Sequence, residues 1–579
     1  MKLRDRALVG ILAVALIALS IAALAPSLHS SDASNDASPT LTPGHHYVEG
    51  VLGQATNASP FGARSAADRA LVALLFRGLV HLGPGNALTG DLAARWEVDP
   101  TGRIWTFHLR DGLTWQDGVP ITADDVAFTV DVLSNPDYAG PGAESWRDVT
   151  ATVVDPLTVQ LALTTPLGGF LQAATQPIAP EHLLGDIPPD QLPDDPFGSD
   201  PIGSGPFRLV MLDPARALLA AATPADVPPV EEGGGPNFAT PRPTDSLATP
   251  PPTRRPDVPV PYLSTFELRF FDDADGLKAA WNRGDLDAAS GLQPDDATAL
   301  SKTPGARLVT YPSSTLLAVT FNLRAGRPEF QDPAVRKALL QAIDRGQIVA
   351  TAMDQLGVRA ESLVPPSSPM FDPTVNPPVA FDRAAARKGL TAAGWKVSGN
   401  SWIPKGGKNP LVLDLYSPEE AANPVAYATA AAVVAGWQAI GLAVRQVPLP
   451  AAELIDDHLG QGDFDVAVVP FAIGLDPDLY PLLAASQTRA GGSNVIGLQD
   501  PDLDKLLVAA RTPIDPITRV ANYRALEVRL AARDYLLPLA FRDDYVVFRD
   551  TVVGPESRLV GASGDRYWDV LTWRLADGS

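Results

Sequence analysis

The 579-residue chain contains no cysteine, and this absence limits its chemistry at once. Disulfide bonds and thiolate metal sites are both excluded. Positive charge is also scarce, because 45 Lys and Arg stand against 67 Asp and Glu and leave a net charge of −22. Nucleic-acid binding needs a basic surface that displaces counterions, so this class of function is disfavoured. The plainer interpretation of the acidic surface is solubility.

Catalytic and phosphate-binding signatures are absent as well. The seven histidines are scattered, and none forms the His-x-x-x-His or His-Glu-x-x-His spacing of a zinc hydrolase helix. The sequence has no Gly-x-x-x-x-Gly-Lys-Ser/Thr phosphate loop, and Gly203-Ser204-Gly205 is a tight turn rather than a nucleophile elbow. We therefore expect no enzymatic activity, no cofactor and no metal, with a hydrolytic enzyme as the least favoured alternative.

One long apolar run is present, at the N-terminus. After the basic residues 1–6, residues 7–25 form an unbroken, weakly apolar stretch of 19 residues. Its length fits a long signal peptide or a short membrane helix, and the preceding basic residues favour export of the body. Ala23-Leu24-Ala25 has a cleavage-site pattern, but Pro26 would hinder cleavage. Residues 1–25 are therefore expected to be a signal peptide or an N-terminal membrane anchor, and both alternatives stay open.

Two further segments have a composition unlike that of a folded domain. Residues 26–43 are rich in Ser, Asp, Thr and Pro and are predicted to form a flexible tether. Residues 224–261 contain twelve prolines and the run Gly233-Gly234-Gly235. Proline removes backbone donors and glycine raises the entropic cost of order, so neither a helix nor a strand is expected. We interpret 224–261 as a disordered Pro-rich insertion, and a partner-docking segment is the alternative.

Periodicity elsewhere predicts a mixed α/β protein. Apolar residues at helical spacing begin at Leu71, and Gly83-Pro84-Gly85-Asn86 is expected to stop that helix. Thr122 followed by Asp125 predicts an N-cap and a helix over 126–133. The turn at residues 99–102 predicts a hairpin. Strands are expected at 96–98, 104–109, 207–211, 266–271, 316–322, 411–416, 444–447 and 466–469, and further helices at 274–283, 335–353 and 424–440.

The order of these parts resembles family 5 extracellular solute-binding proteins of ABC importers, the group of the dipeptide- and oligopeptide-binding proteins. Several short motifs follow one another in the family order over roughly residues 44–575. They are the block 71–133, Ile202–Phe207, Trp281–Asp287, Asn322, Phe330–Ala338, Ala342–Arg345, Ala384–Trp395, Ile440–Leu442, Asp463–Asp465 and Asp476–Asp478. Each motif alone is weakly specific, and the resemblance depends on their shared order.

This resemblance implies an α/β, two-lobed fold of the periplasmic-binding-protein type, class II, with mixed sheets and a hinge between the lobes. Lobe I is expected at 44–315 plus 541–579, and lobe II at 316–540. The chain is expected to cross near residues 311–315 and to return near 539–541. Closure of two lobes on a ligand is a hinge motion in which binding shifts an open–closed equilibrium.

A solute-binding cleft needs aromatic walls and a few polar groups that fix the ligand's orientation. Residues of these types stand at strand ends and turns, where such a wall would lie, although core packing or turn formation is the alternative for each. The family resemblance adds two acids, Asp476 and Asp478. The candidate ligand-binding residues are therefore Thr56, Asn57, Phe321, Asn322, Phe471, Asp476, Asp478 and Asn494.

The chain departs from the family pattern at one position. Peptide-binding members carry an aspartate, after the aromatic residue that matches Phe471, which pairs with the ligand's α-ammonium group. Ile473 stands there in this chain and offers no counter-charge. A buried ammonium without a counter-charge is costly. Either Asp476 or Asp478 takes over this role, or the ligand presents no free N-terminal amine.

The resemblance implies an extracytoplasmic receptor that binds a peptide or similar-sized organic solute and delivers it to a membrane permease and its ATPases. The protein would be a monomer, anchored in the plasma membrane by residues 7–25 or secreted after cleavage. The missing cysteine removes the lipidated residue by which many family members are anchored. An alternative is a membrane-anchored sensor or scaffold that uses the same fold without transport.

Overall fold

The computed structural model describes residues 46–222, 261–489 and 491–576, all of which belong to the unit Pro43–Ser579. The predicted signal peptide or anchor, the tether and nearly all of the Pro-rich insertion lie outside the described residues. Within the described ranges, no helix is both long enough and apolar enough to cross a membrane.

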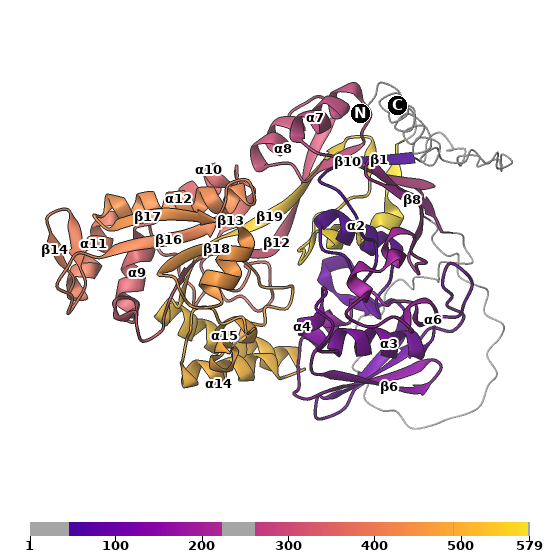
Figure 1. Cartoon of the computed structure of the whole chain (residues 1–579), viewed down its shortest axis with the longest axis horizontal. Coiled ribbons are helices and arrows are strands. Elements are labelled where there is room, and N and C mark those ends of the chain that lie inside the picture. The colour runs from indigo at the N-terminus through magenta and orange to yellow at the C-terminus, as the bar shows by residue number, and fades with distance from the viewer. Residues whose placement is uncertain (1–45, 223–260, 490, 577–579) are drawn as a thin grey trace, which may run out of the picture. The chain divides into compact units, whose positions relative to one another are not determined.

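An 11-stranded mixed sheet is the largest element of the fold (Figure 1). Ten strands lie in the order β17-β16-β18-β12-β19-β11-β1-β10-β9-β8, and β13 pairs with β19 beside this path. In that order their bounds are Ala443–Leu449, Val412–Pro418, Val466–Ala472, Ala306–Phe321, Leu536–Arg549, Ala288–Ser290, His46–Leu52, Thr265–Phe271, Arg216–Ala221 and Phe207–Asp213, and β13 covers Gly357–Arg359.

The pairing within this sheet is parallel at some strands and antiparallel at others. β16 pairs in parallel with both β17 and β18, which are the strands predicted at 444–447 and 466–469. β12 pairs antiparallel with β18 and with β19. These two long strands, β12 and β19, connect the part of the sheet that holds β16–β18 with the part that holds β1 and β10 (Figure 1).

A separate four-stranded sheet has the order β4-β5-β7-β6. Its β4–β5 hairpin is the predicted one, and Asp99 closes its turn by accepting hydrogen bonds from the backbone N–H groups of Arg103 and Ile104, both at 2.9 Å. Three two-stranded ribbons complete the strands. The bounds are β4 Ala93–Val98, β5 Ile104–Leu109, β6 Val149–Asp155, β7 Thr158–Leu163, β2 Val80–Leu82, β3 Leu88–Gly90, β14 Lys396–Ser398, β15 Ser401–Ile403, β20 Val552–Val553 and β21 Arg574–Leu575.

Most of the longer helices begin at a polar N-cap, often with proline in the first turn. Thr122 and Asp125 form the capping box that the sequence predicted for α3. The helices are α2 Ala66–Leu75, α3 Ala123–Ser134, α4 Ala143–Trp146, α5 Phe170–Ala173, α6 Glu181–Leu184, α7 Ala274–Arg283, α8 Pro294–Ser301, α9 Pro333–Gln341, α10 Arg345–Ala352, α11 Arg383–Ala392, α12 Pro424–Ala439, α13 Tyr480–Leu483, α14 Pro501–Arg511 and α15 Pro516–Arg533, with one π-helix at Glu453–Leu459.

Two predicted helices differ from the structure. The helix that begins near Leu71 does not continue to Gly83, because α2 ends at Leu75 and residues 80–82 form a strand. The Leu75 carbonyl accepts hydrogen bonds from the backbone N–H groups of Ser204 and Gly205, at 3.0 and 2.7 Å, in place of a further helical turn. The structure has two helices where a single one was predicted over 335–353. α9 ends at Gln341, and α10 begins after Asp344, whose side chain accepts a hydrogen bond from the backbone N–H of Gln347.

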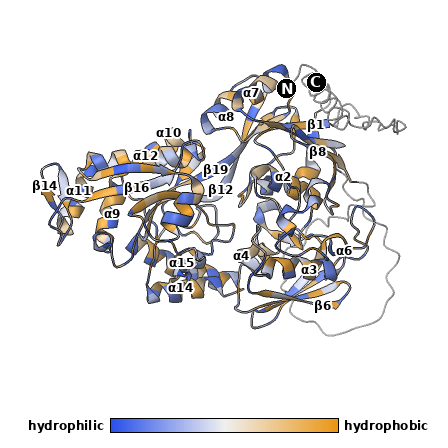
Figure 2. Ribbon diagram, viewed as in Figure 1, coloured by the Kyte–Doolittle hydropathy of each residue, from blue (hydrophilic) through white to orange (hydrophobic). Residues whose placement is uncertain are grey.

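The buried apolar residues form two large cores. The first core draws on residues from Tyr47 to Tyr311 and again from Val546 to Trp573. The second core draws on residues from Leu316 to Phe541. Hydrophobic and hydrophilic residues alternate along the helices and strands of both regions (Figure 2), and the hydrophobic ones supply the buried clusters. The chain passes from one core to the other along β12 and returns along β19.

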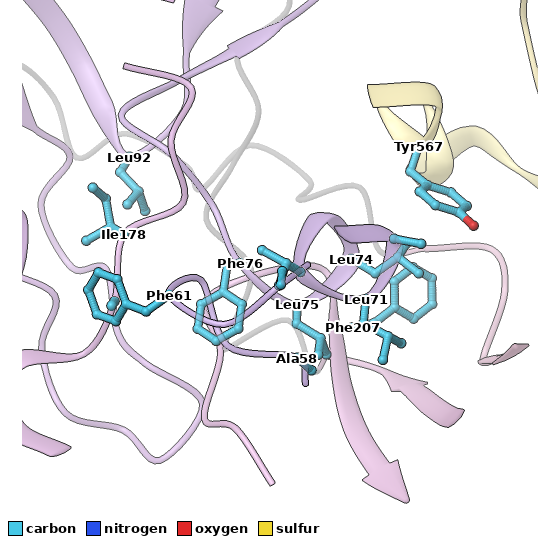
Figure 3. Packing of buried hydrophobic residues seen from close by; sticks show 14 of the residues in the cluster. Ala58, Phe61, Leu71, Leu74, Leu75, Phe76, Leu92, Ile178, Phe207 and Tyr567 are labelled. Atoms are coloured by element: carbon cyan, nitrogen blue, oxygen red, sulfur yellow. The ribbon is translucent and has the colours of Figure 1, made fainter. Parts of the chain in front are cut away.

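The α2 helix shows how the first core is built. Leu71, Leu74 and Leu75 recur at helical spacing and are fully buried. Phe207 and Tyr567 belong to the same cluster and come from parts of the chain far away in sequence (Figure 3). Each such side chain contributes roughly 1.5–3 kcal/mol to the free energy of unfolding by leaving water. The C-terminal segment is thereby tied to the first core.

Candidate functional site

The end of β18 lies where the chain passes between the two cores. Phe471 stands opposite Leu316 of β12 and is half-buried. It packs partly on the second core and partly on a small cluster formed by Leu454, Leu459, Phe464, Ala467 and Val469. The chain stays paired with β12 for one residue beyond β18, because the buried Ile473 donates its N–H to the Ser314 carbonyl at 3.1 Å. Ile473 therefore serves the core.

The strand β12 is irregular at this same level. Its pairing with β19 shifts register between Pro312 and Leu316. Tyr311 belongs to the first core and Leu316 to the second. Ser314 lies in the gap and donates its N–H to the Val560 carbonyl at 3.1 Å. A register shift interrupts regular pairing and bends a strand, and this one lies at the level where the chain passes between the two cores.

Asp476 forms a bidentate ion pair with Arg519 of α15. Arg519 Nη1 and Nη2 donate to the two carboxylate oxygens of Asp476, both at 2.8 Å. The side chains are only 18% and 8% exposed, respectively. Burial by itself would lower the pKa of Arg519, but the hydrogen bonds to Asp476 outweigh it and raise that pKa. A bidentate pair of this kind is geometrically fixed and strongly held.

Asp478 forms an ion pair with a different arginine, Arg511. Arg511 at the end of α14 lies 3.0 Å from Asp478 Oδ2, and its guanidinium also sits over the ring of Tyr480 at 4.4 Å. Burial raises the pKa of Asp478, and Arg511 opposes this shift. Both acids that could pair with a ligand's amine are therefore already neutralised within the protein.

Three other candidate residues have their side chains bound within the protein. Phe321 is fully buried and packs on Phe330 and Trp437, with ring centroids 4.9 and 6.2 Å away. Asn322 donates its amide to the Gly462 and Phe464 carbonyls, both at 2.9 Å. The contacts of these two side chains stabilise the second core.

Asn494 is 1% exposed and organises the loop before α14. Its amide nitrogen donates to the carbonyls of Leu483, Ala484 and Leu498 at 3.0–3.2 Å. Its amide oxygen accepts from Leu498 N at 3.2 Å. These bonds engage both ends of its side-chain amide.

Thr56 and Asn57 line a pocket of about 300 Å³ in the first core region. Their backbone N–H groups donate to Asp68 Oδ1 at 2.8 and 3.1 Å, and the Asn57 amide donates to the Pro193 carbonyl at 2.9 Å. Burial alone would raise the pKa of Asp68, but the backbone N–H donors around it keep that pKa below its usual value. Arg64 and Asp194 form an exposed ion pair at the pocket, 3.1 Å apart.

The structure therefore divides the eight candidates into separate places. Phe471, Asp476 and Asp478 follow one another at the end of β18. Phe321 and Asn322 lie at the opposite end of the β12–β18 ladder, roughly 17 Å away at about 3.3 Å per strand residue. Arg511 and Arg519 were not predicted, because no local pattern links them to acids more than thirty residues away.

The described His, Asp and Glu side chains are not grouped as they would be at a metal centre. In the ranges that the structure describes, no group of three or more His, Asp or Glu side chains is placed to hold a metal ion. His182 instead pairs with Asp117 at 2.9 Å, and His458 stacks on Tyr416 with ring centroids 4.7 Å apart. These histidines have structural partners.

Comparison with known proteins gives the class. Residues 87–493 match the family model of bacterial extracellular solute-binding proteins, family 5. The chain is 27% identical over 557 residues to Protein XP55 of Streptomyces lividans, which covers 95% of this chain and 92% of that protein. It is 26% identical over 451 residues, 76% of each chain, to a Brucella ovis protein described as a putative ABC transporter peptide-binding protein.

A solved structure agrees with this class in its fold. The oligopeptide-binding protein AppA of Bacillus subtilis, in complex with a nonapeptide, superposes with a TM-score of 0.71 at 22% sequence identity. The match covers 93% of this chain and 100% of AppA. This likeness establishes the two-lobed periplasmic-binding-protein fold with mixed sheets. The chain belongs to family 5 of the bacterial extracellular solute-binding proteins, which is a family of binding proteins.

Proposed function

We propose that this protein is the ligand receptor of an ABC importer, without enzymatic activity, and that it binds a peptide or an organic solute of similar size. The observation that carries the proposal is the pair of cores joined by β12 and β19. Two rigid bodies joined by two strands can close on a ligand and can present it, when closed, to a permease. The relative described as an ABC transporter peptide-binding protein supports the importer, and the AppA–nonapeptide complex supports a peptide.

The proposal assigns residues 44–315 plus 541–579 to lobe I and residues 316–540 to lobe II. Residues 7–25 would anchor the protein in the plasma membrane, or be cleaved from it, and residues 26–43 would be the tether. The body would act as a monomer outside the cytoplasm and contact permease subunits. The distribution of the two cores along the chain supports this division, although Phe541 itself packs in the second core and the first core resumes at Val546.

Phe471 is the best-supported ligand contact among the eight candidates. It is aromatic, only half-buried, and lies at the level where the chain passes between the two cores. Thr56 and Asn57 are proposed as polar contacts from the other lobe. Asp476 and Asp478 would contribute only if a ligand displaced their arginines, and Phe321, Asn322 and Asn494 would support the site from within the second core.

Native mass spectrometry of the protein purified from its own envelope tests the proposal directly. A co-purified peptide or organic solute, released on denaturation, is the expected result. Calorimetric titration with that solute then compares Phe471→Ala with Phe381→Ala, because Phe381 is 41% exposed and lies far along the chain from β18. We expect roughly tenfold weaker binding for Phe471→Ala only. Equal affinities would remove Phe471 from the site, and a protein that binds no solute would overturn the function.

A further inference from the structure

A second contact joins the residues of the two cores, apart from β12 and β19. Ile514, in the loop between α14 and α15, packs against the first core although its neighbours belong to the second. Its Cδ1 would lie 3.0 Å from a Cβ built on Gly102, in the β4–β5 turn. Gly168 N donates to the Arg511 carbonyl at 2.7 Å. The segment around Gly168 thus lies directly against the end of α14.

Two adjacent glycines make this close approach possible. A Cβ on Gly168 would lie 1.9 Å from the Pro513 carbonyl oxygen, and a Cβ on Gly169 would lie 2.3 Å from Asp476 Oδ2. Distances this short are sterically forbidden. Neither glycine has a positive φ, so the backbone conformation alone would accept alanine at both positions. The steric demand for glycine comes from residues of the second core region.

The Asp476–Arg519 ion pair packs directly against these two glycines. A Cβ on Gly168 would also lie 2.9 Å from Arg519 Cδ, so the glycine backbone covers both partners of the pair. Because the ion pair is bidentate, its two side chains are held in one geometry. Asp476 and Arg519 therefore present a fixed surface to the glycines.

We propose that these residues form a latch that closes lobe I on lobe II. The latch consists of Gly168 and Gly169 on one side and of Arg511, Pro513 and Ile514 on the other, above the Asp476–Arg519 pair. This inference rests on the two lobes of the proposed function. A contact made only when the lobes are closed stabilises the closed form selectively, and ligand affinity falls in proportion when the closed form becomes rarer. The latch would thus set affinity without touching the ligand.

Pulsed electron resonance between two spin labels tests the latch. The chain has no cysteine, so Asp111→Cys and Lys505→Cys place one label on an exposed site in each lobe without background labelling. The full-length protein, purified in mild detergent, is measured alone and with a random nonapeptide mixture. Gly168→Ala and Gly169→Ala are the test variants, and Gly326→Ala is the matched control, because a Cβ there meets nothing within 4 Å.

We expect a short-distance population in the parent protein and in Gly326→Ala, reduced at least roughly fivefold in Gly168→Ala and Gly169→Ala. Ile514→Ser removes the apolar contact without adding a clash and should reduce the same population. Unchanged distance distributions in all three test variants, or a parent protein without any short-distance population, would overturn the latch. A latch that forms while no nonapeptide binds would leave the latch standing and count against the proposed peptide ligand.

Discussion

At the scale of single residues, the pairing of acids with arginines bears on whether the proposed ligand needs a free amine. Asp476 and Asp478 are the acids that the family resemblance suggests as partners for a ligand's amine. Each carboxylate, however, already contacts a guanidinium, from Arg519 and Arg511 respectively. An ammonium would have to compete with a bond that is already made and partly shielded from water. The gain from a free amine should therefore be small.

We predict that a peptide and its N-acetylated form bind with affinities within about threefold of each other, or that neither binds. Calorimetric titration with a matched peptide pair measures this. The loss of one charge-assisted hydrogen bond would instead cost about 1.5–3 kcal/mol, or roughly ten- to hundredfold in affinity. If acetylation weakens binding by that amount, the prediction is wrong, and Asp476→Asn and Asp478→Asn would show whether either acid is responsible.

Glu527 is a second residue whose environment has a measurable consequence. It lies on α15, is fully buried, and accepts hydrogen bonds from Ser362 Oγ at 3.0 Å and from Asn376 Nδ2 at 2.8 Å. Its other oxygen accepts from Asp372 N at 2.9 Å. Burial raises the pKa of Glu527 to about 7 despite these donors. The folded protein therefore holds this proton more tightly than the unfolded chain does.

The stabilising contribution of this proton is complete below the unfolded pKa of about 4.3 and is lost as the pH rises through about 7. Between pH 5 and pH 8 we expect Glu527 to lower the free energy of unfolding by about 1–3 kcal/mol. Urea titrations at both pH values should show a smaller fall for Glu527→Gln. Glu420→Gln, at an exposed position, is the control and should behave as the parent protein does. An identical fall in all three proteins would contradict the assignment.

At the scale of elements, the strands on either side of the Pro-rich insertion are held together independently of it. β9 and β10 pair antiparallel, with Ala220 opposite Thr265, and β9 also pairs with β8. The chain therefore leaves β9 and enters β10 at neighbouring points. Any linker that spans a hairpin would be long enough to connect them. The insertion itself lies outside the described residues.

Replacement of residues 225–260 by a short Gly/Ser linker is predicted to change the melting temperature by only a few degrees. The entropic cost of closing a loop grows slowly with its length, by about 0.6 kcal/mol per doubling. Thermal unfolding followed by circular dichroism measures the change. A melting temperature lowered by more than about 10 °C, or insoluble protein, would mean that the insertion packs on the body.

At the scale of the whole molecule, the distribution of apolar residues separates the body from the N-terminus. The described helices of the body include none that could cross a membrane. The run at residues 7–25 is the apolar stretch expected to direct export, and it lies outside the described residues. Export is therefore expected to depend on this run, whether the run is then cleaved or stays as an anchor.

Substitution of Ile11, Leu12 and Leu16 by Asp is predicted to retain the protein in the cytoplasm. Each charge in the apolar run costs roughly 2.5–3.5 kcal/mol on insertion scales. Cell fractionation with protease accessibility measures the outcome. The matched control places three Asp residues in the tether, at Ser30, Ser31 and Ser34, and should be exported normally. Normal export of the first variant would refute the role of the run.

The sequence determined those features whose partners lie within a few residues of each other. The Thr122 cap and the hairpin at Asp99 are set by side chains and turns that act over two to five positions, and both were predicted. The order of the family motifs likewise identified the class and its fold. Such features can be predicted from the sequence because the short stretch of chain between the interacting groups fixes the distance between them.

Only the tertiary structure decided the contacts between distant segments. α2 ends at Leu75, where a turn some 130 residues further along the chain takes its last carbonyl. Asp476 is neutralised by Arg519, 43 residues away, and Phe321 is drawn into the second core. Residue type and spacing state what a side chain can bind, but packing brings a particular partner within reach, and that depends on the whole fold.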